Sequence, residues 1–424
     1  MTLKLQLDSF SYSIQPQSIL NKTSSKVAFF NGISSRLYQK INLSVTDYSD
    51  TILQVAPNFN ETWAALNSVL VKGIKGIVAN YFTDERIRAT YNFPSELEKI
   101  LEFAKETPFE IGMFRPDFVI EEETLQPKIC EIGARYPING WMVSYYSQQI
   151  LSEIYEKENL PFESISSQLK FPEVLMSKFN KDIELVLLHN KEPGTEVFGL
   201  LRIFEANGFK ILSASPAELT LDEFGQVLCK GIPVSQFIME MDRLELLGFD
   251  LEVLKSMVQN GFCLNDVRTL ILVHDKRILS ILSNKSVMTR FLNENEYAFL
   301  EKFLIPSYGL DDTSIKNMIH SDSNEWIFKK NSGGRGIDMF LKSDFKGGDL
   351  ETFLEEEGAD YMAQLFVKQA LFPAPEPTIF VGMLLFLNNS SFGHGIFRGG
   401  QSGIINVKDQ RAKLFAGSHP KQSN

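Results

Sequence analysis

Hydrophobic and polar positions change their period along the chain, and these changes predict a mixture of helices and strands. The segment 94–106, PSELEKILEFAKE, has apolar residues at helical spacing. Two short apolar runs follow, IGMFRPDFVI at 111–120 and PKICEIG at 127–133, separated by the polar turn EEETLQ. Two such runs around a short polar turn predict a β-hairpin.

The pattern changes between residues 182 and 266. A continuous apolar strand, IELVLLH, is followed by the turn NKEPG, the helical segment TEVFGLLRIFEANG and a second strand, FKILSAS. Gly208 suits the end of that helix. A fully apolar strand followed by a helix and another strand predicts a βαβ unit of a parallel sheet.

The last third of the chain alternates helical and strand patterns. It contains a helical stretch with a basic start, HDKRILSILSNKSVMTRFL, a strand–loop–strand segment at 325–341, EWIFKKNSGGRGIDMFL, and the acidic helix DLETFLEEEGA. Two apolar strands, YMAQLFV and TIFVGMLLFL, are expected to pair. We therefore predict an α/β fold with α+β character in three segments, 1–180, 181–265 and 266–424.

Composition narrows the class of protein. The 424 residues include 44% hydrophobic residues, enough for a large core, and the formal net charge of −11 disfavours binding to nucleic acid or to an anionic membrane. Cys130, Cys229 and Cys263 lack the spacing of a zinc site or a disulfide framework. Because no signal peptide or membrane span is recognisable either, we expect a cytoplasmic protein with a small-molecule partner.

The predicted hairpin carries two carboxylates. Alternation places Arg115 and Asp117 on one face of the first run, and Glu131 lies on the second. If the turn pairs the two runs, Asp117 and Glu131 converge beside Arg115, and such oxygen ligands near a phosphate suit Mg²⁺. The alternative is an ion pair between Arg115 and Glu131 on a surface sheet.

The loop within 325–341 combines Lys329 with glycines at 333, 334 and 336. Glycines can adopt positive φ and present N–H groups to an anion, so the loop can hold a phosphate. The alternative is a flexible hairpin with solvated lysines. The spacing matches neither a Walker A motif nor a Rossmann fingerprint.

Several motifs occur in a characteristic order: RPDF with EIGARYPING, the βαβ unit, and then HDKRILSILSN, FKKNSGGRGI, YMAQLFV and GIFRGG. This order resembles the circularly permuted ATP-grasp enzymes, a group that includes the synthetase half of glutathionylspermidine synthase, over roughly residues 110–410. Lys329 and Gly336 keep the spacing of the family's K(P)xxGxxG loop. The resemblance implies a permuted ATP-grasp fold with a central βαβ pre-ATP-grasp domain.

The resemblance also implies a role for each matching residue. Asp117 and Glu131 would ligate Mg²⁺, and Lys276 and Lys329 would hold the α- and β-phosphates of ATP, with Lys285 as the alternative to Lys276. The other implied contacts are Arg115 to the transferring phosphate or the acyl phosphate, Arg398 to the reacting carboxylate, Gly333, Gly334 and Gly336 to the phosphates, and Gln364, Phe366 and Val367 to the adenine. Apart from the resemblance, Arg135 and Asn139, in the run after Glu131, are candidate substrate contacts, since a guanidinium suits a substrate carboxylate.

Two positions depart from the family pattern. Gly133 replaces the asparagine two residues after the glutamate, so water, Asn139 or Asn406 would have to complete the metal shell. Lys330 replaces the proline after the loop lysine, which leaves the loop more flexible and more positive. The first departure puts the number of metal ions, and with it catalytic competence, in question.

By this resemblance the chain is an ATP-dependent carboxylate–amine ligase that forms an amide bond through an acyl phosphate and releases ADP and phosphate. Alternatives are a small-molecule kinase on the same fold and a nucleotide-binding protein without catalysis. The expected partners are a carboxylic acid and an amine, such as an amino acid or a polyamine, and self-association is open. Because an acyl phosphate hydrolyses readily, we expect residues 331–336 to form a lid that is open without nucleotide. His274 and His394 lie in motif regions, where a structural histidine is more common than a ligand contact.

Overall fold

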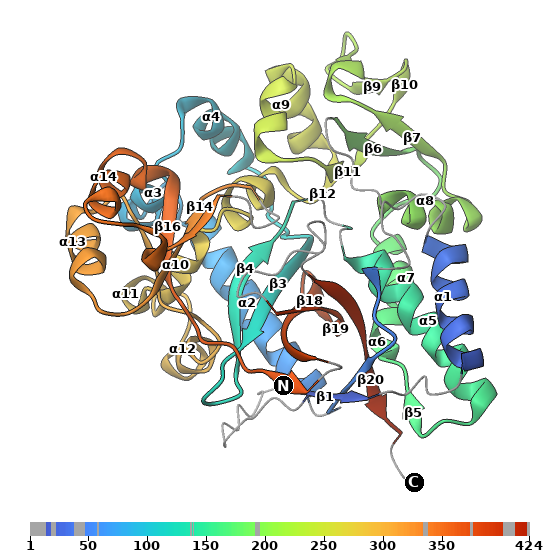
Figure 1. The fold of residues 1–424 in the computed structure, drawn as a ribbon. Helices are drawn as coiled ribbons and strands as arrows, with labels where there is room; N and C mark the ends of the chain where they lie inside the picture. Colours follow the sequence, from blue (N-terminus) through green and yellow to red (C-terminus); the bar gives the residue numbers. More distant parts are fainter. Residues whose placement is uncertain are drawn as a thin grey trace.

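The computed structural model describes residues 14–17, 23–37, 47–56, 59–135, 138, 140–190, 196–333, 338–373, 376–401 and 412–421. Its centre is a nine-stranded sheet in the order β1-β2-β20-β19-β18-β3-β4, with β17 paired to β18 and β5 paired to β20 (Figure 1). Strands β2 and β20 run parallel, and the other neighbours are antiparallel. The strands are β1 (Ile14–Gln17), β2 (Ile52–Val55), β3 (Met113–Ile120), β4 (Pro127–Gly133), β5 (Phe162–Glu163), β17 (Phe372–Pro373), β18 (Pro377–Leu387), β19 (Ser390–Gly400) and β20 (Lys413–Pro420).

The described residues also form three smaller sheets. A four-stranded parallel sheet has the order β12-β11-β6-β7, a four-stranded antiparallel sheet has the order β13-β16-β14-β15, and a three-stranded sheet has the order β10-β9-β8. Their strands are β6 (Leu185–His189), β7 (Ile211–Ala214), β8 (Leu219–Leu221), β9 (Val227–Cys229), β10 (Ile232–Pro233), β11 (Gln236–Glu240), β12 (Phe262–Leu264), β13 (Ser307–Gly309), β14 (Trp326–Lys330), β15 (Met339–Leu341) and β16 (Tyr361–Leu365).

Helices cover the large sheet and flank the smaller ones (Figure 1). They are α1 (Thr23–Leu37), α2 (Phe59–Ala79), α3 (Glu85–Tyr91), α4 (Ser95–Ala104), α5 (Trp141–Glu158), α6 (Ser166–Leu169), α7 (Phe171–Met176), α8 (Val197–Ala206), α9 (Leu251–Asn260), α10 (Ile278–Ser283), α11 (Lys285–Met288), α12 (Glu294–Glu301), α13 (Thr313–Ser321) and α14 (Asp349–Glu356). Short 3₁₀ turns are η2 (Pro216–Glu218), η3 (Arg243–Gly248), η5 (Lys342–Asp344) and η6 (Gly358–Asp360), and η4 (Thr269–Val273) is a π-helix.

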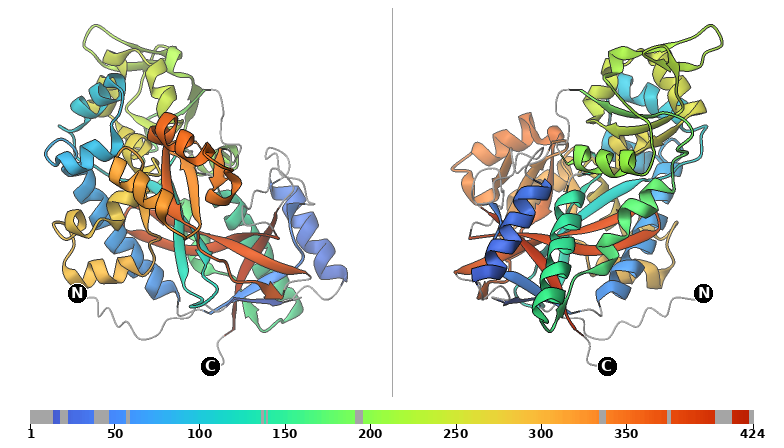
Figure 2. Two further views of the ribbon diagram at one scale, coloured as in Figure 1. Left: turned by 60° about the vertical axis from the view of Figure 1, so that its left-hand side comes forward. Right: turned by 90° about the vertical axis from the view of Figure 1, so that its right-hand side faces the viewer.

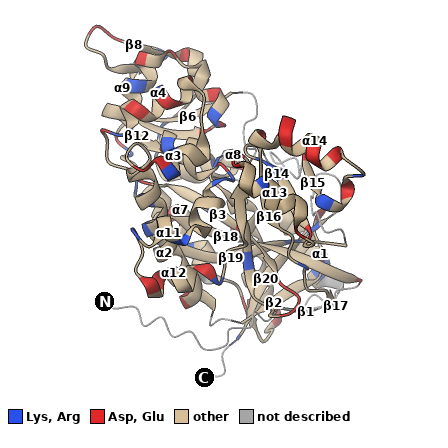
Figure 3. Cartoon of the chain, turned by 90° about the vertical axis from the view of Figure 1, so that its left-hand side faces the viewer, with Lys and Arg blue, Asp and Glu red and all other residues tan. Residues whose placement is uncertain are grey.

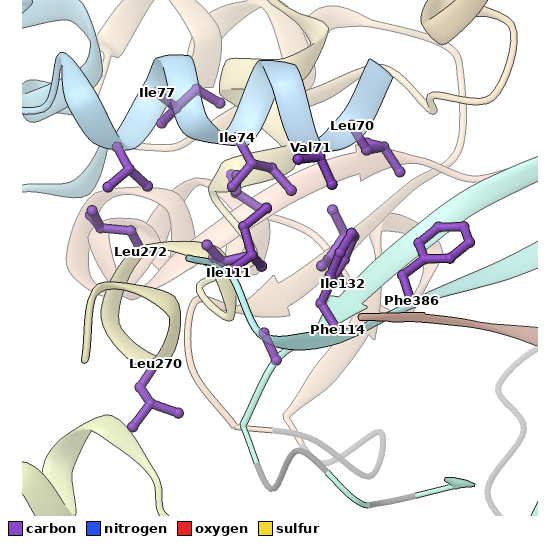
Figure 4. Packing of buried hydrophobic residues seen from close by; sticks show 14 of the residues in the cluster. Leu70, Val71, Ile74, Ile77, Ile111, Phe114, Ile132, Leu270, Leu272 and Phe386 are labelled. Atoms are coloured by element: carbon purple, nitrogen blue, oxygen red, sulfur yellow. The ribbon is translucent and has the colours of Figure 1, made fainter. Parts of the chain in front are cut away.

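Different helices pack on the two faces of the large sheet. Side chains alternate along a strand, so Phe397 and Ile396 point to opposite faces. The face of Phe397 packs against α2, where Leu70 and Ile74 lie over Phe114 (Figure 4). The face of Ile396 packs against α1 and α5, which lie side by side (Figure 2). Burial on both faces makes this sheet a fixed platform for the residues that it carries.

The small sheet with β14 and β16 lies against the large sheet (Figure 2). Leu365 and Val367, at and beyond the end of β16, pack on Val119, Ile379 and Val381 of the large sheet. This contact brings side chains from two sheets towards the same place, and the candidate site lies there.

Asn265 fixes the position of the β3–β4 hairpin. Its buried side-chain amide donates to the carbonyls of Met113 and Ala134, at 2.7 and 2.9 Å, and its carbonyl accepts from the N–H of Met113. Gly112 has a φ of +79°, and a Cβ there would lie 2.1 Å from Asn265 Oδ1, so only glycine allows this approach. The hairpin is thereby tied to the segment that follows the parallel sheet.

Most predicted elements are confirmed. The two apolar runs form the antiparallel β3–β4 hairpin, and β6, α8 and β7 form a βαβ unit with parallel strands. Gly208 follows α8 with a φ of +88°. The segment 325–341 forms β14 and β15 in antiparallel register. The division into three segments stays a prediction, although the large sheet takes strands from both the first and the last of them.

One sequence-based expectation is wrong. YMAQLFV and TIFVGMLLFL do not pair: β16 pairs with β13 and β14, whereas β18 pairs with β3, β17 and β19. Both strands are apolar because both are buried, and this property does not identify a partner. The helical stretch from His274 is confirmed as two helices, because α10 ends at Ser283 and Asn284 caps α11.

The surface of helix α14 is acidic. Acidic residues gather on α14 (Figure 3), and Asp349, Glu351, Glu355 and Glu356 of this helix are exposed. Within the described ranges no helix is long and apolar enough to cross a bilayer.

Candidate functional site

The β3–β4 hairpin places two carboxylate positions side by side. In its register Asp117 lies opposite Glu131 and Arg115 lies opposite Gly133, with an irregularity after Asp117. The predicted nearness of Asp117 and Glu131 is therefore confirmed, whereas their role as metal ligands stays a prediction.

The Asp117 carboxylate is held by two arginines. Arg115 Nε donates to Oδ1 at 2.8 Å and its Nη2 donates to Oδ2 at 3.2 Å. Arg398, on β19, donates to the same Oδ2 at 2.6 Å. Asp117 is only 2% exposed, so both of its oxygens are engaged by charge-assisted hydrogen bonds. Arg115 thus pairs within its own strand, and Arg398 reaches Asp117 across β18.

The environment of Glu131 is strongly positive. Burial opposes ionisation of this carboxyl group, but the neighbouring cations outweigh it and hold its pKa below the ordinary value. Within the part of the chain that the structure describes, its carboxylate makes no hydrogen bond, so it is held ionised by charge alone. The four cations are Lys276, Lys329, Arg115 and Arg398.

Lys329 joins the small sheet to the hairpin. Lys329 lies on β14, and its buried Nζ donates to the carbonyl of Cys130 at 2.9 Å and to Gln364 Oε1 at 2.6 Å. Gln364 in turn donates to Ser307 Oγ at 2.9 Å. Burial, reinforced by Lys276, lowers the pKa of Lys329, and Glu131 acts in the opposite direction. Lys329 is therefore a fixed cation beside the carboxylate pair.

Lys276 holds the start of the glycine loop. Its Nζ donates to the carbonyl of Gly333 at 2.8 Å, and its backbone N–H donates to the carbonyl of Asn331 at 3.0 Å. Lys276 is buried, whereas the alternative, Lys285, is exposed at the start of α11 and lines a cavity of about 760 Å³ whose lining also includes Ser307. The structure thus brings Lys276, and not Lys285, beside Glu131; the phosphate role of either lysine stays a prediction.

The glycine loop is described only at its ends. Gly333 has a φ of +100°, as expected of a loop glycine, while Gly334 and Gly336 lie outside the described residues. Asn331 is buried, and its backbone N–H and side-chain amide donate to the carbonyls of Asp360 and Ala359. The lid expected over residues 331–336 stays a prediction, and these bonds tie its first residue to the turn before β16.

Other predicted contacts are arranged differently from the expectation. Strand β16 ends at Leu365, so Phe366 and Val367 follow the strand and do not belong to it. The Phe366 N–H already donates to the carbonyl of Glu325. Arg135 forms an ion pair with Asp242 at 2.5 Å, and Asn139 and Asn406 lie outside the described residues.

Glu196 is a supporting residue that the sequence analysis missed. Its buried carboxylate accepts from the backbone N–H groups of Gly140, Met142 and Val143, at 2.8, 3.0 and 3.1 Å, at the start of α5. A Cβ at Gly140 would lie 3.1 Å from Arg115 Nη1, so this turn lines the arginine. Burial raises the pKa of Glu196 despite these bonds. The cap comes from a distant helix, so local capping signals could not reveal it.

Glu196→Ala leaves three N–H groups at the start of α5 without an acceptor. We expect the free energy of unfolding to fall by about 2 to 3 kcal/mol. Urea denaturation measures this, with Glu205→Ala, an exposed position of α8, as a control that changes by less than about 0.5 kcal/mol. A Glu196→Ala protein as stable as the control would contradict the capping role.

The charges of the site suit a phosphate more than a metal cage. Four cations surround two carboxylates, which leaves an excess of two positive charges. Within the described ranges no group of three or more His, Cys, Asp or Glu side chains could hold a metal ion. Mg²⁺ that binds with a nucleotide needs only one or two carboxylates. Glu131 fits this need, while Asp117 would first have to release an arginine.

One solved structure with a synthetase-like name shares the fold of this chain. A glutathione synthetase-like effector from Globodera pallida, in its apo form, matches with a TM-score of 0.58 at 11% identity, over 94% of this chain and 96% of that one. A proposed gamma-glutamylcysteine synthetase from Methylobacillus flagellatus KT matches with a TM-score of 0.43 at 10% identity, over 83% of this chain and 88% of that one. At 11% identity the first likeness establishes a common mixed α/β fold, and the second is too distant to carry an argument.

The sequence comparisons add little to this. The family model for the AnkG N-terminal domain matches residues 66–272, a little under half of the chain. No curated protein matches the chain. The helices and sheets of the structure, together with the shared fold, confirm the α/β class. The circular permutation of an ATP-grasp fold stays a prediction.

Proposed function

We propose that the protein is an ATP-dependent carboxylate–amine ligase of the circularly permuted ATP-grasp type that releases ADP and phosphate. The observation that carries this proposal is the excess of fixed positive charge around Glu131, at the contact between two sheets. Phosphoryl transfer depends mainly on positioning and on charge stabilisation, and such a cluster can supply both. The fold shared with a synthetase-like protein supports the same class.

Each member of the cluster has a part in this proposal. Lys276 and Lys329 bind the phosphates of ATP, and Arg115 and Arg398 turn from Asp117 to the acyl phosphate as it forms. Mg²⁺, held by Glu131 and by the released Asp117, would neutralise charge on the β- and γ-phosphates. Gln364, Phe366 and Val367 border the adenine, and Gly333 belongs to the loop over the phosphates.

The substrates belong to the same proposal. Arg135 contacts the carboxylic acid only if it leaves Asp242, with which it is paired in the structure. The acid and the amine are small molecules, such as amino acids, short peptides or polyamines.

A product assay tests this function. The protein is incubated with Mg-ATP and with pairs from a panel of amino acids, short peptides and polyamines, and ADP and new masses are recorded. We expect ADP release that requires both an acid and an amine, together with a product lighter by one water than their sum. ADP formed with a single phosphorylated substrate would instead show a kinase.

A second candidate function is nucleotide binding without catalysis. Two observations favour it: Gly133 stands where the related motif has a metal-binding asparagine, and both oxygens of Asp117 are engaged by arginines. This candidate predicts tight binding of ATP and no ADP from any pair in the panel.

A further inference from the structure

His274 lies beside the candidate site, and one of its ring nitrogens makes no hydrogen bond to any residue that the structure describes. It follows the π-helix η4 and is 4% exposed. The backbone N–H of Ala134, just beyond β4, donates to its Nδ1 at 3.3 Å. In the described part of the chain no hydrogen bond reaches Nε2, which is buried. A buried polar atom without a partner is rare in native proteins.

The bond from Ala134 determines the tautomer of the ring. An N–H donor requires a lone pair at Nδ1, so the neutral ring carries its proton at Nε2. Burial, followed by the charges of Arg135 and Lys276, holds the pKa of His274 well below its ordinary value. At neutral pH the side chain is therefore an uncharged donor at Nε2.

The cations with the largest electrostatic effect on His274 cannot satisfy this donor. They are Arg135, Lys276, Arg243 and Arg115, all of which carry donors only. The carboxylate of the next residue, Asp275, accepts instead from Arg243 and Arg277. An acceptor must therefore come from outside this group. Two of these cations, Lys276 and Arg115, also belong to the cluster around Glu131. An anion that binds to both of them would therefore lie near the His274 ring.

We propose that His274 is a ligand-binding residue whose Nε2–H donates to an anionic oxygen bound beside Lys276 and Arg115. The inference rests on the proposed function, in which this oxygen belongs either to a phosphate of ATP or to the substrate carboxylate. The competing explanation is that His274 acts only as an anchor for Ala134.

Two substitutions distinguish the ligand role from the anchor role, because one keeps the acceptor of Nδ1 and the other keeps the donor of Nε2. In His274→Asn the amide oxygen takes the place of Nδ1 and still accepts from Ala134, but the donor at Nε2 is lost. In His274→Gln the longer side chain can place an amide N–H near the position of Nε2. A merely structural histidine is replaced well by asparagine, whereas a ligand donor is replaced better by glutamine.

The experiment measures the affinity for Mg-ATP by calorimetry and, at saturating Mg-ATP, the KM for the acid identified by the product assay. Thermal unfolding without ligand serves as the measure of folding. We expect His274→Asn to unfold like the wild type and to lose about tenfold in one of the two affinities, with recovery in His274→Gln. A loss in Mg-ATP affinity identifies a phosphate oxygen, and a rise in KM identifies the carboxylate.

The outcomes distinguish the inference from the proposed function. If the wild type binds Mg-ATP and turns over substrates, and His274→Asn leaves both constants unchanged, the inference is overturned and the proposed function stands. If the wild type neither binds Mg-ATP nor releases ADP, both are overturned. A His274→Asn protein that loses stability as well as affinity, without recovery in His274→Gln, also overturns the ligand role.

Discussion

Lys329→Met is expected to weaken the binding of Mg-ATP by about 30- to 100-fold, the loss of about 2 to 3 kcal/mol of charge-assisted hydrogen bonding, and to abolish ADP release. Lys329 is buried and fixed by Cys130 and Gln364, so its charge is already in place when a ligand arrives. Methionine keeps much of the volume and removes only the ammonium group. Calorimetry with Mg-ATP and an ADP-release assay measure the two effects.

The matched control is Lys330→Met, on the next position of the same strand. Lys330 is exposed and lies 3.8 Å from the exposed Asp338, so its loss removes the same formal charge without touching the buried cluster. We expect less than a threefold change in affinity for this variant, as for other exposed ion pairs. Equal effects of the two substitutions would mean that only the net charge matters and that Lys329 is not part of a site.

Asp117→Asn is expected to lower the free energy of unfolding by about 3 kcal/mol and to abolish ADP release. Removing one partner of a buried ion pair leaves uncompensated charge, which costs about 3 to 5 kcal/mol, and the partial exposure of Arg115 and Arg398 places this case at the lower end. The two guanidinium groups also lose the acceptor that orients them. Chemical denaturation and the ADP assay measure the two results.

Asp338→Asn is the control for this variant, because Asp338 pairs only loosely with Lys330 at an exposed position. We expect it to change stability by less than about 0.5 kcal/mol. If Asp117→Asn were as stable as this control and kept full activity, the carboxylate would have neither the structural nor the catalytic part assigned to it.

Local patterns were sufficient to predict the elements but not all of their partners. The β3–β4 hairpin follows from two alternating runs around a polar turn, and the βαβ unit follows from an apolar strand, a helix and a glycine. The expected pairing of β16 with β18 is wrong because the apolar pattern of each strand shows that it is buried but not which strand it pairs with. Between β16 and β18 the chain passes from the small antiparallel sheet to the large sheet. No local sequence pattern shows that two successive strands belong to different sheets.

In the candidate site, too, the contacts within one hairpin could be predicted from the sequence, whereas the contacts between distant strands could not. Asp117 and Glu131 face each other because a hairpin register is a local property. The ion pair of Arg398 with Asp117 depends on the strand order β19-β18-β3, and the bond of Lys329 to Cys130 depends on the packing of two sheets. Neither relation can be read from spacing along the chain, and the same holds for the cap that Glu196 provides.

The most direct test of a nucleotide-phosphate site is a titration of the wild-type protein with Mg-ATP, Mg-ADP and adenosine by calorimetry. Cations that recognise phosphates should bind Mg-ATP and Mg-ADP saturably at one site, and adenosine should bind at least about 100-fold more weakly because it lacks every charged contact. Adenosine binding as tightly as Mg-ADP, or no binding of either nucleotide, would contradict the assignment of this cluster.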